Sequence, residues 1–261
     1  MDRVIYDHNP LFEVVAQLQF PTILSIGVDI PAKFQELVRR SFPLVEIKHA
    51  INVNVDVALG EAKSHSKTFY EFLSEDKAFK IVLGDDFIAL STSQYRHWED
   101  FSNQLKLAID ALGAVYDVQF FTRIGLRYVD IIDRAHLNLK EIPWAELLRP
   151  SLLGILSEEF GADDQIKIES MVTNFSLDGG NVKCTFNCGL PNPDILNDDQ
   201  RKSAENGNLI VLDTDFFSPE GNTNAADAFS SLATYNKCTR NAFRWAIKEH
   251  LHKALGPQAP K

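Results

Sequence analysis

Residues 8–20, HNPLFEVVAQLQF, place an Asn-Pro turn directly before an apolar run. Pro10 fixes its own φ angle and keeps Asn9 out of the helical region, so the run begins in an extended conformation. Glu13 and Gln17 lie an even number of residues apart, which puts both side chains on the same face of a strand. These polar side chains need hydrogen-bond partners, because an unpaired buried polar group is costly. The stretch therefore predicts a strand with a polar network on one face.

The composition limits the class of protein. The chain has 261 residues, 45% of them hydrophobic and 24% charged, which is typical of a globular protein that can bury a large core. A net charge of −10 disfavours nucleic acid and anionic membranes as general partners, although a local basic helix can still bind nucleic acid. No segment reaches the roughly 20 apolar residues of a membrane span, and the N-terminus has no signal-peptide pattern. These features predict a cytoplasmic protein that does not bind membranes.

Strand patterns dominate both halves of the chain. In the first half we expect strands at residues 11–20, 23–30, 51–57, 67–74, 78–83, 87–91 and 118–132, and helices at 31–40 and 98–112. Gly113 is expected to close the second of these helices. In the second half we expect short helices at 143–149 and 151–159, strands at 165–177, 181–190 and 209–216, a polar loop at 191–208 and one long helix at 225–255.

These elements predict an α+β fold of antiparallel sheets covered by helices, with a long C-terminal helix. Residues 1–135 would form an N-terminal antiparallel lobe and residues 143–261 a C-terminal lobe with the closing helix, unless both pack as one compact unit. Each half runs from helix through antiparallel strands to a closing helix. Two similar lobes are therefore compatible with the pattern, although no residue-level repeat supports a duplication.

Two motifs carry a resemblance to a known family. The first reads Asn9-Pro10-Leu11-x-Glu13-Val14-x-x-Gln17-Leu18-x-Phe20, and the second reads Phe121-x-Arg123-Ile124-Gly125-Leu126-Arg127-Tyr128-Val129. Together with Leu212-Asp213-x-Asp215 and the closing helix, they make the chain resemble a sporadically distributed, functionally uncharacterised bacterial family. The resemblance covers nearly the whole chain. The family usually shows a Leu-His pair early in the last helix, where this chain has Leu232-Ala233.

What the resemblance implies is a genetic setting and not a reaction. A patchy distribution implies horizontal transfer, and therefore mobile elements, toxin–antitoxin pairs or phage defence. Because Ala233 replaces the family histidine, no role of that histidine is carried over to this chain.

Arg123 and Arg127 form the second polar feature of the chain. They lie four residues apart on one face of the expected strand, with Gly125 between them. Two guanidinium groups at this spacing can bind an anionic group, or they can pair with acids across the sheet. Because buried arginines are usually paired, we favour a structural polar network of Glu13 and Gln17 with these two arginines.

Asp213 and Asp215 share a strand face and are weak candidates for a metal site. Paired carboxylates can bind Mg²⁺ or act in acid–base chemistry. A metal nuclease needs a further acid or histidine, for which Asp130 and Asp133 are available, although their spacing does not specify them. A solvated or salt-bridged strand end is the favoured interpretation. We therefore expect no metal, no cofactor and no catalytic residues.

The three cysteines do not form a recognisable zinc pattern. Cys184 and Cys188 share a strand face, and Cys238 lies alone in the last helix. A structural zinc site has four ligands at recognisable spacing, so we expect three thiols in the core.

The last expected helix carries a basic ridge at spacings of three and four residues, with Trp245 at its edge. Such a ridge can dock an acidic partner or a phosphate backbone, or it can be a solvated face whose cations suit a helix C-terminus. Tryptophan is enriched in binding hot spots. The candidate partner-binding residues are therefore Lys237, Arg240, Arg244, Trp245 and Lys248.

Two classes of function remain. The missing catalytic motifs favour a non-enzymatic binding or regulatory protein, as the partner, sensor or neutralising component of a defence or toxin–antitoxin-type system. Its partner would be another protein encoded nearby, and a homo-oligomer is compatible with the sequence. The alternative is a metal-dependent nuclease or phosphoryl-handling enzyme that uses Asp213 and Asp215 with Arg123 and Arg127.

Overall fold

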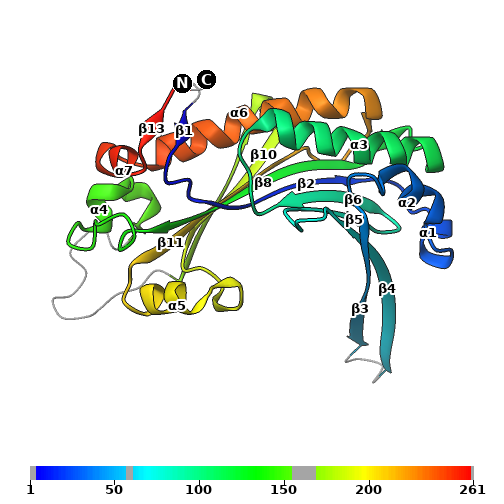
Figure 1. The fold of residues 1–261 in the computed structure, drawn as a ribbon, viewed down its shortest axis with the longest axis horizontal. Coiled ribbons are helices and arrows are strands. Elements are labelled where there is room, and N and C mark those ends of the chain that lie inside the picture. The colour runs from blue at the N-terminus through cyan, green and yellow to red at the C-terminus, as the bar shows by residue number, and fades with distance from the viewer. Residues whose placement is uncertain (1–3, 57–60, 155–168, 260–261) are drawn as a thin grey trace. The chain divides into compact units, whose positions relative to one another are not determined.

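The computed structural model describes residues 4–56, 61–154 and 169–259. The largest element is an antiparallel sheet of nine strands, hydrogen-bonded in the order β3-β4-β5-β6-β2-β8-β11-β10-β9. Helices accompany the sheet (Figure 1), so the predicted α+β class is confirmed.

The chain divides into two compact units that are each discontinuous in sequence. The first unit contains residues 1–14, 126–219 and 233–261, and the second contains residues 15–125 and 220–232. The division falls within β2 (Leu11–Gln19) and β8 (Arg123–Asp133), so both of these strands contribute to both units. The boundary that the sequence predicts between residues 135 and 143 stays a prediction.

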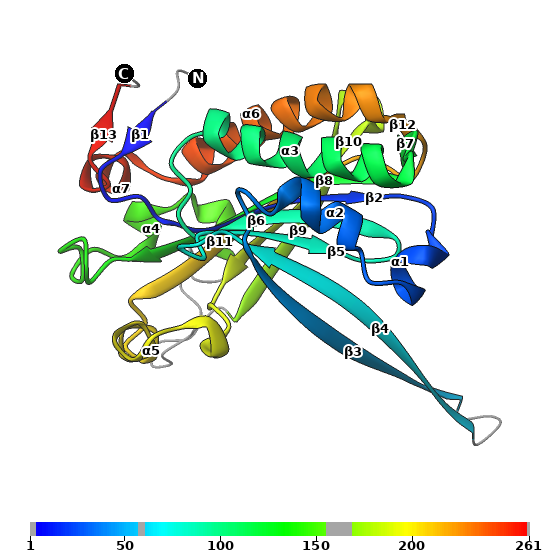
Figure 2. The same ribbon diagram turned by 45° about the vertical axis from the view of Figure 1, so that its right-hand side comes forward.

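The second unit is built around an antiparallel meander. Its strands are β3 (Leu44–Asp56), β4 (Glu61–Leu73), β5 (Phe79–Leu83) and β6 (Phe87–Thr92), with a short ribbon of β7 (Phe120–Phe121) and β12 (Thr223–Asn224). β3 and β4 pair along their whole length, whereas β4 pairs with β5 only through Tyr70–Leu73. The β3–β4 ribbon therefore continues beyond β5, as Figures 1 and 2 show.

Three helices complete the second unit: α1 (Leu24–Val28), α2 (Ala32–Val38) and α3 (Trp98–Tyr116). Phe34 of α2 meets Phe72 of β4 with ring centroids 5.2 Å apart, and both are buried. The helical spacing expected in α3 is present, since the five apolar residues that define it are buried: Phe101, Leu105, Ala108, Ile109 and Leu112.

The first unit contains the strands β9 (Ser170–Leu177), β10 (Val182–Gly189) and β11 (Leu209–Phe217), and β1 (Ile5–Tyr6) pairs with β13 (Pro257–Gln258). Its helices are α4 (Trp144–Leu147), α5 (Asp198–Glu205), α6 (Ala228–Ala246), which begins in the second unit, and α7 (Glu249–Ala254). The 3₁₀ turns in the described part of the chain are η1 (Pro150–Leu152), η3 (Asp178–Gly180), η4 (Pro193–Ile195) and η5 (Ala225–Asp227).

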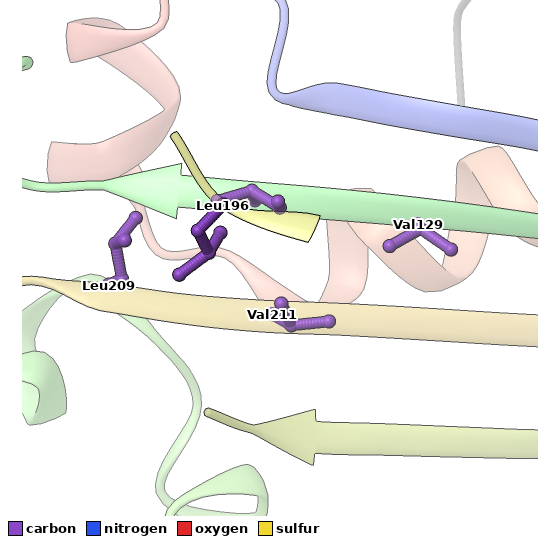
Figure 3. Close-up of a cluster of buried hydrophobic side chains, with 5 residues drawn as sticks. Val129, Leu196, Leu209 and Val211 are labelled. Carbon is purple, nitrogen blue, oxygen red and sulfur yellow. The ribbon is translucent and has the colours of Figure 1, made fainter. Parts of the chain in front are cut away.

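Each face of the first unit's sheet packs differently. On one face, the Tyr128 hydroxyl donates to Asn236 Oδ1 of α6 at 2.9 Å. On the opposite face, strand periodicity places an apolar cluster from β8 and β11, onto which Leu196 packs after η4 (Figure 3). The cluster consists of Val129, Ile131, Leu196, Leu209 and Val211. These contacts explain why β8 is buried on both faces over most of its length.

Two expected elements are wrong in type. Residues 23–30 are not a strand, because the Ile23 N–H bonds to the Asp85 carbonyl at 2.7 Å and the chain then turns into α1. Residues 191–208 are not a loop, because they contain η4 and α5. Asn197 and Gln200 form a reciprocal capping box at the start of α5, a helix-start signal that the polar composition concealed.

Two expected helix ends are also wrong. Gly113 does not close α3, which continues to Tyr116 and ends at Asp117 in the left-handed conformation with φ 52°; aspartate tolerates this conformation better than most residues. The helix expected at 225–255 is interrupted, since Ile247 forms a β-bridge with Leu148 and α7 begins only at Glu249. The expected elements at 151–159 and 165–177 fall partly outside the described residues.

Candidate functional site

Arg127 of β8 and Asp213 of β11 form a bidentate ion pair. Arg127 donates from Nε to Oδ1 at 2.7 Å and from Nη2 to Oδ2 at 2.6 Å. Asp213 thereby raises the pKa of Arg127, and Asp215 and Glu13 add smaller electrostatic contributions. The Arg127 side chain is 49% exposed and the Asp213 side chain 19%. Both carboxylate oxygens of Asp213 are therefore occupied at the surface of the sheet.

The remaining residues of the expected polar network are Glu13, Gln17 and Arg123. Glu13 is half-buried on β2 and acts on Arg127 electrostatically. Gln17 and Arg123 are also half-buried, and both belong to the second unit. The hydrogen bonds of Arg127 thus go to Asp213, and a network that includes Glu13, Gln17 and Arg123 stays a prediction.

Asp213 and Asp215 are not joined by further metal ligands in the described part of the chain. Asp215 is half-buried and lies opposite Thr185 of β10. Within residues 4–56, 61–154 and 169–259, no group of three or more His, Cys, Asp and Glu side chains is arranged to hold a metal ion. Each oxygen of Asp213 already accepts a hydrogen bond from Arg127.

Asp130 is a buried carboxyl of the first unit. It lies on β8 with only 4% of its surface exposed. Burial, with a smaller contribution from the charge of Asp213, raises the pKa of Asp130 to about 8. Asp133, in contrast, ends the strand by accepting hydrogen bonds from the Ala135 N–H and from the Ser203 hydroxyl. Neither aspartate extends the Asp213 pair into a cluster of acids.

Cys184 and Cys188 are buried free thiols, and Cys238 is a half-buried one. Burial raises the pKa values of Cys184 and Cys188 to about 12, and burial also raises the pKa of Cys238. A thiol is reactive and binds metal as the thiolate, so these side chains remain in their unreactive form near neutral pH.

The basic ridge of the C-terminal helices is largely engaged within the chain. Arg244 bonds to the Ile247 carbonyl and to Glu249, and Lys248 donates to the Ala145 carbonyl at 2.6 Å. Arg240 is half-buried, and its Nε has no hydrogen-bond partner among the described residues. Lys237 is exposed. The break after Ala246 also prevents these residues from forming one continuous helical ridge.

Trp245 lies over two side chains of the first unit. It is 40% exposed, and the Arg149 guanidinium stacks on its ring at 5.6 Å while Arg149 Nε donates to its carbonyl. The ring of Phe186 meets it edge-on with centroids 6.5 Å apart. This packing gives Trp245 a structural role even though one side of it faces solvent.

An exposed apolar surface on α1 is the feature that the sequence patterns missed. Leu24, Val28 and Ile30 are 78%, 82% and 73% exposed, whereas Ile26 of the same helix is fully buried. Leu24 and Val28 are four residues apart, so they share one side of the helix. We call Leu24, Val28 and Ile30 the α1 patch. Apolar residues at every second position predict a strand with one buried face. Such a strand would bury Leu24, Val28 and Ile30 together with Ile26.

Charged and apolar residues follow the α1 patch along the chain. Ile30 precedes Pro31, and Leu37 of α2 is 48% exposed. Lys33 of α2 and Arg40 beyond its end are exposed, and so are Asp29, between Val28 and Ile30, and Glu36 of α2. The apolar residues are thus accompanied in sequence by exposed charges of both signs.

The fold and the surface define an α+β protein with an exposed apolar patch. No protein-family model, no curated protein and no solved structure matches the chain. Among the described helices, none is both long enough and apolar enough to cross a membrane.

Proposed function

We propose that the chain is a non-enzymatic binding or regulatory protein that recognises another protein through the α1 patch. The observation that carries this proposal is the exposure of Leu24, Val28 and Ile30 within seven residues. Contiguous exposed apolar side chains are costly in water and mark interaction sites. Burying one such side chain contributes roughly 1.5–3 kcal/mol, so three of them can form the centre of an interface.

The favoured partner is another protein with an apolar surface, encoded near this chain. The α1 patch has exposed charges of both signs near it in sequence, Asp29 and Glu36 as well as Lys33 and Arg40. Complementary charges steer association and suppress wrong partners. The partner surface is therefore expected to have an apolar centre bordered by charged side chains.

The resemblance to a sporadically distributed bacterial family supports the setting of this interaction. We place the protein in a defence or toxin–antitoxin-type system in the cytoplasm, as the sensing or neutralising component. The nuclease alternative has weaker support, because Arg127 takes both oxygens of Asp213.

Co-purification tests the proposal. The tagged chain and the product of the adjoining gene are co-expressed, and the complex is isolated with the wild-type chain, with Leu24→Asp and with Asp213→Ala. We expect Leu24→Asp to lose the complex and Asp213→Ala to retain it. The same proteins are incubated with DNA and RNA and with Mg²⁺ or Mn²⁺. Metal-dependent cleavage that Asp213→Ala abolishes would overturn the proposal.

A further inference from the structure

The two outer strands of the nine-stranded sheet differ in their protection. β3 is one edge and β9 is the other. An edge strand presents unpaired N–H and C=O groups, and proteins usually guard such an edge with charged side chains, proline or a bulge. β3 carries Glu46 and Lys48, which pair with each other at 2.6 Å. This edge is therefore guarded against an added strand.

β9 lacks such protection. Its eight residues, SMVTNFSL, contain no charged residue, proline or glycine. It pairs in continuous antiparallel register with β10, from Leu177 opposite Val182 to Ser170 opposite Gly189, without a bulge. Among the described residues no strand pairs with its outer edge. In the described part of the chain, β9 is therefore a regular edge strand to which a further strand can add.

The start of β9 is held firmly in place. Leu190 donates its N–H to the Glu169 carbonyl at 3.0 Å. A Cβ at Gly189 would collide with that carbonyl and with Ser170, so only glycine allows this close approach. Thr185 and Asn174 add a side-chain hydrogen bond of 2.9 Å between the two strands. A rigid, preformed edge loses little conformational entropy when it binds another strand.

The exposed side chains of β9 include large apolar residues. Val172, Phe175 and Leu177 are 53%, 38% and 41% exposed. Phe175 and Leu177 point to one face of the sheet together with Met171, because side chains alternate along a strand. Thr173 also lies on this apolar face. The opposite face carries Val172 between polar residues.

From these observations we propose that β9 is the interface between two copies of this chain, which pair antiparallel edge to edge. A two-fold axis perpendicular to the sheet brings odd-numbered residues opposite odd-numbered residues. Met171 then lies opposite Phe175 of the partner subunit in one register and opposite Leu177 of the partner subunit in another. In both of these registers apolar side chains meet on one face of the joined sheet. An uncharged edge also allows two acidic chains to meet without like charges directly opposed.

The second copy is a better occupant than a peptide from another protein. An exposed apolar strand that lacks charge complements itself, whereas it has no charged group to select a foreign sequence. The proposal does not depend on the α1 patch, which lies in the second unit.

Sedimentation equilibrium of the full chain tests the proposal. We expect a monomer–dimer equilibrium, with a dissociation constant in the range of about 1–50 μM because a single strand pair forms a small interface. Val172→Lys is expected to raise this constant at least about tenfold, and Ile47→Lys on the guarded edge β3 is the matched control, since Ile47 is 51% exposed. Circular dichroism and thermal unfolding establish that both variants fold.

Three results would overturn the proposal. The first is a wild-type chain that remains monomeric at about 100 μM, where an equilibrium of this strength forms dimers. The second is a dimer that is unaffected by Val172→Lys. The third is a dimer that Ile47→Lys weakens as strongly as Val172→Lys does.

Discussion

The Arg127–Asp213 pair and the α1 patch are opposite kinds of surface. The pair consists of two charges that satisfy each other through two short hydrogen bonds. The α1 patch consists of three apolar side chains that remain more than 70% exposed. Charged residues attract attention in a sequence, but a satisfied ion pair has little left to offer a ligand. Exposed apolar residues are the better indication of binding, because exposing them to water does not stabilise the fold.

Ile26 and Leu24 test the contrast within α1 itself, and here we expect the largest effect. Ile26→Ala should lower the free energy of unfolding by about 3 kcal/mol, because a fully buried isoleucine leaves a cavity. Leu24→Ala should change it by less than about 0.5 kcal/mol, since an exposed side chain makes few contacts. Urea unfolding monitored by fluorescence measures both. Equal losses in the two variants would show that the α1 patch is needed for folding and would remove the reason to assign it to binding.

The buried carboxyl of Asp130 is expected to make the stability of the protein depend on pH. Its pKa in the folded protein is about 8, above the ordinary aspartate value of 3.8, so the native state retains a proton that the unfolded chain releases between these values. The free energy of unfolding therefore falls as the pH rises from about 4 to about 8. Asp130→Asn removes this dependence and should be more stable than the wild type by about 2 kcal/mol at pH 9.

The measurement for Asp130 is urea unfolding at pH 5 and at pH 9. The difference between variant and wild type is compared at the two values, so that other titrating groups cancel. A difference that is the same at both pH values would mean that Asp130 is ionised in the folded protein throughout.

The Arg127–Asp213 pair should have a smaller effect. Arg127→Ala and Asp213→Ala are each expected to lower the free energy of unfolding by about 1 kcal/mol, because water screens a half-exposed guanidinium. The double variant should show that the two losses overlap, which measures the coupling between the residues. The attraction between two charges is screened least at low salt. A coupling free energy of zero under that condition would show that the ion pair does not form in solution.

Sequence patterns predicted the α+β class and the strands β2 and β11 well, because their apolar residues are buried as the periodicity requires. They failed where contacts outside the periodic pattern decide the structure. The capping box of Asn197 and Gln200 begins α5 inside a polar segment, and the long-range bridge of Ile247 to Leu148 follows the early end of α6. Partners distant in sequence also decide ion pairs, so the spacing of Arg127 could not show that its partner is Asp213.

The α1 patch escaped prediction for a related reason. Apolar residues at alternate positions between residues 24 and 30 fit a half-buried strand, and only the tertiary structure shows that Ile26 alone is covered. Exposure is a property of the whole fold, whereas periodicity is a property of a segment. Partner binding through the basic ridge stays a prediction, although Arg244 and Lys248 bond to groups within the chain.

Isothermal titration of the chain with the product of its adjoining gene tests the central claim most directly. Val28→Asp places a charge at the centre of the α1 patch, and we predict at least about tenfold weaker binding, which corresponds to about 1.4 kcal/mol. Arg127→Ala, the matched change at the satisfied ion pair, should leave the affinity unchanged. Binding that is unaffected by Val28→Asp but lost in Arg127→Ala would contradict the account.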